Sequence, residues 1–259
     1  MGSLPRLFYG VGHWSFLFLP MLTAIIVAAG DSGRMGFDKL FAAIAGKPVI
    51  AHTIRAFQRA TSVNEIIVVA REDRHNEIKT IVRDEKSEKV RSIIPGGKHR
   101  QDSVRAGLDH LDSATRWVAV HDAARPLIAP EQIERVFQQC ANHGAAALAE
   151  PINDTLKRAN SDPFDSRSGQ ALLVSGSVDR DQLYAMQTPQ IFERQLIEEA
   201  YRSVCAENIF VTDEVSAVER MGRKVVLVVN GELNFKITYP RDLPLADFIL
   251  KQRMDSVAT

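Results

Sequence analysis

The chain has 259 residues, and its 32 basic and 32 acidic side chains cancel to no net charge. A chain of this length can bury a full hydrophobic core without disulfides. The balanced charge gives no indication of a nucleic-acid or membrane partner, so any recognition of phosphate has to be local. The two cysteines, Cys140 and Cys205, show no metal-ligand spacing and are interpreted as reduced thiols of a cytoplasmic protein.

The first 20 residues are apolar and aromatic and differ in character from the sequence that follows. Their apolar run, at 14–19, is too short to span a bilayer, and no signal-peptidase site follows it. We therefore expect residues 1–20 to be a non-essential extension. The sequence predicts a single domain at 21–251 and a short tail at 252–259.

A buried strand is predicted at 24–29, because this short apolar run does not alternate with polar residues. Glycines at 30, 33 and 36 follow it, and the same loop carries Arg34 and ends near Lys39. Such a loop can bring backbone N–H groups and cations to phosphate oxygens. The alternative is an ordinary strand-to-helix turn with a solvated Arg and Lys. The glycine spacing fits neither a P-loop nor a dinucleotide-binding fold.

Strands and helices then alternate along the chain. A helix is predicted from Lys47, a strand at 65–70, a surface helix within 71–89 and a strand at 90–95. Another helix precedes the apolar run that ends at His121 and Asp122. This alternation predicts an α/β fold of Rossmann-like character, with a mostly parallel sheet and helices on both faces.

Three motifs, AAGDSGRMG, GGKHRQDS and HDAARP, each directly follow a predicted strand. Ligands of such sheets bind at the carboxyl ends of the strands, so we expect the three motifs to meet on one rim. Asp122 can approach a divalent metal or a ribose hydroxyl there, or it can form a structural ion pair with Arg125. Ser103 can bond a ligand at a helix start, although a simple cap by Asp102 or Ser103 is the alternative.

Residues 152–187 break the alternation with two strand-like pieces around a polar, turn-rich tip. They are interpreted as a projecting β-arm, and because an isolated hairpin is marginally stable, we expect the arm to pack on a second subunit. Helices at 193–206 and from Pro240 to Lys251, and strand-like KVVLVV and NFKIT, complete the chain.

Three polar residues have alternative roles. Thr212 is predicted to cap the helix of TDEVSAVERMG, and this capping role is sufficient to explain a threonine at this position without a ligand. Lys236 lies among strand-like apolar residues and needs a partner or a cleft for its charge, and phosphate is one such partner. His121 could act as a base, but a histidine at a strand end is more often satisfied by hydrogen bonds.

Taken together, the motifs are more specific than any one loop. AAGDSGRMG with Lys39, GGKHRQDSV, VHDAARP, PINDTLKR, VDRDQL, MQTPQIF, VTDE and NFKIT occur in this order. The chain resembles the 2-C-methyl-D-erythritol 4-phosphate cytidylyltransferase family over about residues 22–251. The resemblance implies a nucleotide-diphospho-sugar transferase-like fold and a nucleotidyltransferase of isoprenoid precursor biosynthesis. It also implies cytidylyl transfer from CTP to methylerythritol phosphate, with Mg²⁺ or another divalent cation, in a homodimer without a nucleic-acid or membrane partner.

The resemblance also assigns roles to residues. The triphosphate of CTP would be wrapped by Ala28, Ala29, Gly30, Gly33 and Arg34. The base and ribose would be held by Gly97, Lys98, Ser103 and Ala123. Methylerythritol phosphate would be held by Thr155, Arg180, Thr188, Thr212 and Lys236. Asp122 would lie between substrate and metal, and the catalytic cations would be Arg34, Lys39 and Lys236. Asp38 stands where family members often have Pro.

Two alternatives remain. A cytidylyltransferase for another polyol phosphate, such as ribitol 5-phosphate, would share the fold. Such relatives tend to have AGG where this chain has Ala28-Ala29-Gly30, and a bulkier residue where it has Ala123 and Ala124. The second alternative is a regulatory module that binds the nucleotide without catalysis, which would be expected to have lost its charged positions.

Overall fold

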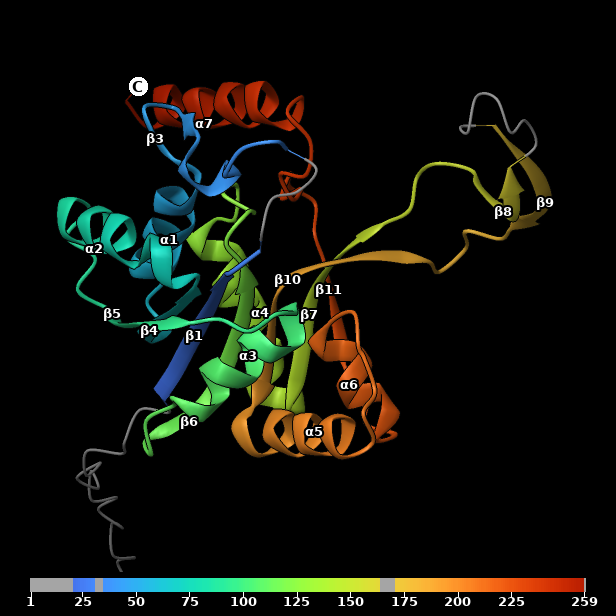
Figure 1. Ribbon diagram of the computed structural model, residues 1–259, viewed down its shortest axis with the longest axis horizontal. Coiled ribbons are helices and arrows are strands. Elements are labelled where there is room, and N and C mark those ends of the chain that lie inside the picture. Colours follow the sequence, from blue (N-terminus) through green and yellow to red (C-terminus); the bar gives the residue numbers. More distant parts are fainter. Residues whose placement is uncertain (1–20, 31–34, 164–170, 259) are drawn as a thin grey trace, which may run out of the picture.

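A computed structural model describes residues 21–30, 35–163 and 171–258 of the chain. Its centre is a seven-stranded sheet in the order β11-β7-β10-β6-β1-β4-β5 (Figure 1). The strands of this sheet are β1 (Met21–Ala28), β4 (Val63–Ala70), β5 (Val90–Pro95), β6 (Thr115–Asp122), β7 (Ala145–Pro151), β10 (Tyr184–Glu193) and β11 (Val226–Val229). The predicted extension at 1–20, Gly33 and Arg34 lie outside the described residues.

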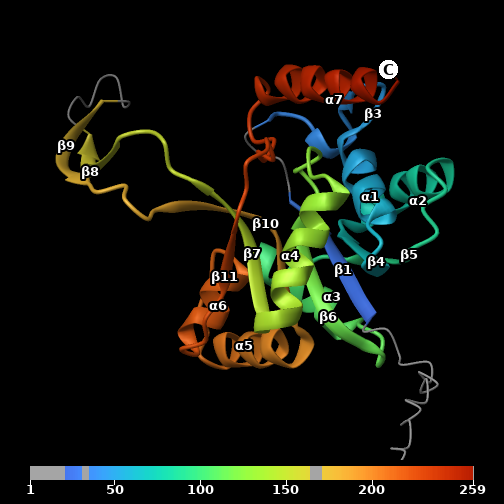
Figure 2. The ribbon, with the colours of Figure 1, turned by 180° about the vertical axis from the view of Figure 1, so that it is seen from behind.

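The helices cover both faces of this sheet, as the sequence predicted. They are α1 (Val49–Arg59), α2 (His75–Asp84), α3 (Arg100–Asp109), α4 (Pro130–His143), α5 (Arg194–Ala206), α6 (Glu214–Arg220) and α7 (Asp242–Ala258). There are two short 3₁₀ turns: η1 (Lys39–Phe41) follows β1, and η2 (Glu72–Arg74) joins β4 to α2. In Figure 1, α3 lies in front of the sheet, and in Figure 2, α4 does.

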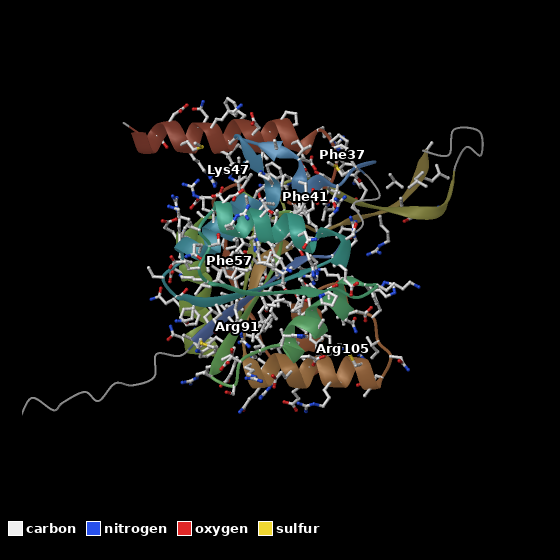
Figure 3. All side chains as sticks on the ribbon, turned by 60° about the vertical axis from the view of Figure 1, so that its left-hand side comes forward. Phe37, Phe41, Lys47, Phe57, Arg91 and Arg105 are labelled. Carbon is white, nitrogen blue, oxygen red and sulfur yellow. The ribbon has the colours of Figure 1, made fainter. Side chains whose placement is uncertain are left out.

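The buried side chains form one apolar layer on each face of the sheet. Along β1, Ala24 and Ile26 belong to the layer that receives α1, α2, α4 and α7, whereas Ile25 belongs to the layer under α3, α5 and α6. Because successive side chains of a strand point to opposite faces, an unbroken apolar run is needed where both faces are covered. Phe57, labelled in Figure 3, is completely buried in the first layer.

The order of the strands places a switch point between β1 and β6. From β1 the chain moves outward to β4 and β5, and then returns to add β6 on the other side of β1. All these neighbours pair in parallel, and Val27 of β1 pairs with Asp122 of β6. The carboxyl ends of two strands whose connections diverge leave a crevice between the loops.

Two strand predictions were incomplete or wrong. The MQTPQIF segment was not predicted as a strand, yet it lies in β10, which runs antiparallel between β6 and β7. Its pairing with β7 shifts between Met186 and Gln190, so Pro189 lies in an interruption of the ladder where a missing N–H is tolerated. NFKIT is wrong as a strand, because residues 234–238 belong to no strand of the sheet. The Ile237 N–H instead donates to the Ala124 carbonyl over 2.8 Å.

The arm predicted at 152–187 contains β8 (Leu156–Pro163) and β9 (Leu172–Val178), which among the described strands pair with each other alone. Its predicted end was wrong, because residues 184–187 already belong to β10 of the central sheet. Both views show it standing well away from the central sheet (Figures 1 and 2). Another two-stranded sheet, β2 (Ala43–Ile44) with β3 (Lys47–Pro48), lies beside α7. Within the described ranges, every helix is too short or too polar to cross a bilayer.

Candidate active site

A cavity of about 310 Å³ opens at the switch point. Residues from five segments line it: Val27, Ala28, Ala29, Gly30, Met35, Lys39, Leu40, Gly97, Lys98, His99, Arg100, Ser103, Asp122, Ala124, Lys236 and Thr238. The three motifs predicted to share one rim therefore do so. Among the described residues, this lining has four cationic side chains, those of Lys39, Lys98, Arg100 and Lys236, and one carboxylate, Asp122. The described part of the cavity is therefore suited to an anionic ligand.

The loop after β5 approaches the end of β1 so closely that it requires glycine. A Cβ atom on Gly96 would lie 2.3 Å from Cβ of Ala29, and one on Gly97 would lie 2.2 Å from Cβ of Asp102. The backbone N–H of Gly97 donates to Oγ of Ser103 over 3.2 Å. Because Gly96 and Gly97 have no side chain, the loop after β5 can pack directly against Ala29 and against the first turn of α3.

Asp102 and Ser103, the two predicted caps, both lie inside α3 and not at its N-cap position. Helix α3 begins at Arg100 with His99 as its N-cap, and the Asp102 carboxylate accepts from the His99 backbone N–H over 3.0 Å. Ser103 is buried, accepts from Gly97 and donates to the His99 carbonyl over 3.2 Å. Asp102 therefore stabilises the helix start, whereas Ser103 orders the cavity loop.

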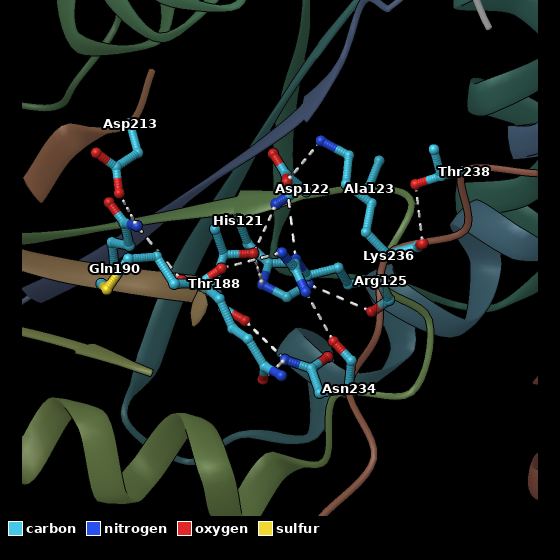
Figure 4. A network of polar contacts seen from close by, with 12 residues as sticks. His121, Asp122, Ala123, Arg125, Thr188, Gln190, Asp213, Asn234, Lys236 and Thr238 are labelled. Carbon is cyan, nitrogen blue, oxygen red and sulfur yellow. Dashed lines mark hydrogen bonds and ion pairs between the residues drawn. The ribbon is translucent and has the colours of Figure 1, made fainter. Parts of the chain in front are cut away.

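Asp122 is the electrostatic centre of the cavity. Its Oδ1 accepts from Nε of Arg100 and its Oδ2 accepts from Nζ of Lys236, both over 2.9 Å (Figure 4 includes the second contact). Nε of Arg125 lies 3.7 Å from Oδ2. Burial by itself would raise the pKa of Asp122, but Arg100, Lys236 and Arg125 outweigh it and hold the pKa well below its usual range. Asp122 is therefore an anion that keeps three cations in place.

Sequence reasoning missed Arg100. Its guanidinium bridges Asp122 and Glu214, with distances of 2.7 and 2.9 Å to the two Glu214 carboxylate oxygens. Glu214 is completely buried and also accepts from the Tyr201 hydroxyl over 2.8 Å. Burial opposes the charge of Arg100, yet the two carboxylates raise its pKa above the usual value. The sequence signal for Arg100 was its place in the GGKHRQDS motif, on the same predicted rim as Asp122.

His121 and Thr188 form a buried chain behind Asp122 (Figure 4). Nε2 of His121 lies 3.4 Å from the Arg125 carbonyl, and Nδ1 lies 3.0 Å from Oγ1 of Thr188. With Nε2 as the donor, Nδ1 accepts from Thr188, whose oxygen accepts from the Asp122 N–H over 3.1 Å. Burial is the main cause that lowers the pKa of His121 to about 3. The His121 ring is thus neutral and satisfied by hydrogen bonds, which was the alternative to its role as a base.

Arg125 has mainly structural contacts. It donates to the carbonyl oxygens of Asn234 over 2.8 Å and Met186 over 3.4 Å, and so joins β10 to the segment that carries Lys236 (Figure 4). Ala123 is also buried, with its N–H donating to the Val27 carbonyl over 3.0 Å. Ala123 and Thr188 therefore lie behind the cavity lining, while the neighbouring Ala124 is part of it.

Besides Thr188, three more residues predicted to bind the acceptor lie outside this lining. Thr155 and Arg180 are exposed at the base of the arm, where Arg180 donates to the Asn153 carbonyl. Thr212 is exposed, and its predicted capping role was wrong, because Asp213 is the N-cap of α6 and accepts from the Ser216 N–H over 3.0 Å. One chain thus brings the predicted nucleotide residues of its described part together in the cavity lining, except Ala123, which is buried behind it. Of the predicted acceptor residues, only Lys236 belongs to this lining.

Comparison with known proteins gives a consistent result. Residues 22–252 match the family model described as 2-C-methyl-D-erythritol 4-phosphate cytidylyltransferase. The protein of that name from Pelotomaculum thermopropionicum is 38% identical over 240 residues, covering 92% of this chain and 97% of that protein. One from Dehalococcoides mccartyi is 39% identical over 230 residues, covering 88% and 96%. The crystal structure of 4-diphosphocytidyl-2C-methyl-D-erythritol synthase from Anaerococcus prevotii superposes with a TM-score of 0.76 at 29% identity, covering 90% and 97%.

Proposed function

Because the chain belongs to the 2-C-methyl-D-erythritol 4-phosphate cytidylyltransferase family, we propose that it transfers a cytidylyl group from CTP to 2-C-methyl-D-erythritol 4-phosphate. An oxygen of the acceptor phosphate attacks the α-phosphorus of CTP, the bond from that phosphorus to the β-phosphate bridging oxygen breaks, and pyrophosphate leaves. The product is 4-diphosphocytidyl-2-C-methyl-D-erythritol, an isoprenoid precursor. The cation-rich cavity at the switch point is the observation that carries this proposal.

Such a transfer needs positioning and charge neutralisation rather than a nucleophilic side chain. Lys39 lies in the cavity lining on the side of the first loop, and Lys236 lies on the side of Asp122. We assign Lys39, with Arg34, to the charge that develops on the α- and β-phosphates, and Lys236 to the acceptor phosphate. Ala28, Ala29, Gly30 and Gly33 would approach the triphosphate. The base and ribose would be positioned by Gly97, Lys98 and Ser103, with the buried Ala123 behind this lining.

The residues present fit a divalent cation that the nucleotide helps to bind. Among the described residues, no three His, Cys, Asp or Glu side chains gather into a metal site. Mg²⁺ is commonly held by one or two carboxylates together with substrate phosphates, and Asp122 is the carboxylate of this cavity. Asp122 would hold Mg²⁺ with the triphosphate of CTP, and the ion would supply further neutralisation of phosphate charge.

We further propose that the enzyme is a cytoplasmic homodimer joined through the arm. Leu172, Leu173 and Val174 of β9 are 54%, 49% and 63% exposed, which is unfavourable for a two-stranded hairpin in water. Insertion of the arm beside the cavity of a partner would cover them and bring Thr155 and Arg180 to an acceptor site. The free thiols of Cys140 and Cys205 are consistent with a reducing compartment.

The test is pyrophosphate release from CTP and Mg²⁺ with and without methylerythritol phosphate. We expect release only with the acceptor, and methylerythritol phosphate should be turned over far better than ribitol 5-phosphate. The small side chain of Ala124 in the cavity lining, with the buried Ala123 behind it, supports that preference. Preference for ribitol 5-phosphate would contradict the assigned substrate, and CTP binding without pyrophosphate release would indicate a non-catalytic module.

A further inference from the structure

The 3₁₀ turn η1 carries Lys39 to the cavity but is weakly held by its own backbone. It has three residues, and its two backbone hydrogen bonds, from Phe41 N–H to the Asp38 carbonyl and from Ala42 N–H to the Lys39 carbonyl, are both 3.3 Å long. Short 3₁₀ turns with such long bonds do not fix their own orientation. The position of Lys39 must therefore be imposed by the surroundings of η1.

Asp38 is the polar anchor of this turn. Its Oδ1 accepts from the Leu40 N–H over 3.3 Å, and its Oδ2 accepts from Nη2 of Arg71 and Nε of Arg74, both over 3.0 Å. The Asp38 side chain is only 12% exposed. A carboxylate that is so little exposed to solvent is stable only when it is paired with cations. The ion pairs of Asp38 therefore fix η1 relative to Arg71 and Arg74.

The two arginines follow closely on a central strand of the sheet. Arg71 directly follows β4, which pairs with β1 along its whole length, and Arg74 ends η2. The Arg74 guanidinium also lies over the ring of Phe41, 5.2 Å from its centroid, while Leu40 is buried. Phe37 and Phe41, labelled in Figure 3, flank the Asp38-Lys39-Leu40 segment. Asp38 thus ties the end of the first loop to the carboxyl end of the neighbouring strand.

We propose that Asp38 is a positioning residue for Lys39, acting through its ion pairs with Arg71 and Arg74. This inference rests on the proposed function of Lys39 at the transferred phosphate. Loss of the tie lets η1 shift relative to the cavity, and a displacement of about 1 Å in a group that stabilises a transition state can reduce turnover by about 10²-fold. The substrates, which contact other parts of the cavity, should bind nearly as before.

The test compares Asp38→Asn with a matched control, Asp73→Asn. Asp73 pairs with the same arginines, over 3.1 Å to Arg71 and 3.7 Å to Arg74, and its side chain is 63% exposed. These ion pairs do not involve a residue of η1, so Asp73→Asn removes a similar charge without loosening the turn. Asp38→Asn keeps an oxygen for the Leu40 N–H and loses the charge. We expect it to lower kcat by about tenfold or more with KM for both substrates within about twofold, whereas Asp73→Asn leaves kcat within about twofold. Asp38→Glu, which retains the charge, should recover part of the loss.

A second measurement does not depend on activity. Trypsin cleavage after Lys39, followed by mass spectrometry, should be several-fold faster in Asp38→Asn than in Asp73→Asn, because local opening of η1 exposes the bond. Equal cleavage and equal kcat in the two variants would overturn the proposal, as would a loss of kcat that only follows a lower folded fraction. Absence of turnover in the wild-type chain would instead contradict the proposed function, and the cleavage rates would still decide whether Asp38 holds η1.

Discussion

The rim of the cavity and the arm contain polar residues of the same proposed site, but they are held in place differently. At the rim, Asp122 is 7% exposed and contacts two cations at 2.9 Å, and the strands behind it are buried on both faces. On the arm, Val174 is 63% exposed, and within the described part of the chain β8 and β9 pair only with each other. The rim is therefore organised within one chain, whereas the arm leaves apolar side chains exposed, and these are the ones that we propose to pack on a partner. We infer that nucleotide and acceptor recognition differ in their dependence on the dimer.

The largest effect is expected for Asp122→Asn. Removing this charge leaves Arg100, Arg125 and Lys236 without their common partner in a mostly buried site. Breaking such a cluster typically costs roughly 3–5 kcal/mol. Chemical denaturation should show this loss, together with weaker CTP binding. Asp84→Asn, at a carboxylate 62% exposed and paired with Arg83, is the control and should leave stability nearly unchanged. Similar unfolding curves would contradict a rim held together by Asp122.

Lys39→Ala should reduce kcat by about 10²–10³-fold, the effect of removing one group that stabilises developing charge. The Lys39 side chain lines the cavity and not the apolar layers, so the free energy of unfolding should change little. Steady-state kinetics and thermal unfolding measure the two effects. Retained kcat would exclude the role assigned to Lys39.

Val174→Asp should weaken the proposed dimer while sparing the rim. A charge placed in an apolar contact costs roughly 2 kcal/mol, or about 30-fold in the dimer Kd. We expect light scattering to show dissociation and kinetics to show a raised KM for methylerythritol phosphate, with CTP binding largely retained. Leu245→Asp on α7, at a residue 51% exposed, is the control away from the arm. An unchanged dimer would contradict the interface assigned to β9.

The effect that is smallest near neutral pH, and grows as the pH falls, is the protonation of His121. An unfolded histidine has a pKa near 6.5, whereas burial lowers the pKa of His121 to about 3 in the folded chain. Between these values the unfolded chain binds a proton that the folded chain does not, so stability falls as pH decreases from about 6.5. His121→Gln should flatten the dependence of the unfolding free energy between about pH 6.5 and 4. Exposed His143→Gln should not, and an unchanged slope in His121→Gln would show that His121 titrates normally.

Much of the fold was predictable because local patterns and burial agree. The apolar runs at 24–29 and 65–70 coincide with most of β1 and β4, because central strands covered on both faces need mainly apolar residues. The predicted strand at 90–95 is β5, a partly exposed edge strand that contains Arg91 and Ser92. MQTPQIF was not predicted as a strand because its polar residues and proline are untypical of a central strand. In the fold, tertiary hydrogen bonds satisfy these polar groups. In that segment, Gln190 accepts from the N–H groups of Glu214 and Val215 over 3.1 Å. The NFKIT prediction failed for the opposite reason, because apolar residues there pack without a pairing strand.

By itself the sequence determined the doubly covered sheet, the rim at its strand ends and the family, because these follow from periodicity and from motifs in a fixed order. It also pointed to Asp122, Lys39 and Lys236. The tertiary structure decided the charge partners, because pairs such as Arg100 with Glu214 and Asp38 with Arg74 join residues far apart in the chain. A solvated charge and a buried charge look the same in a sequence. Only packing removes the water and makes the partner necessary.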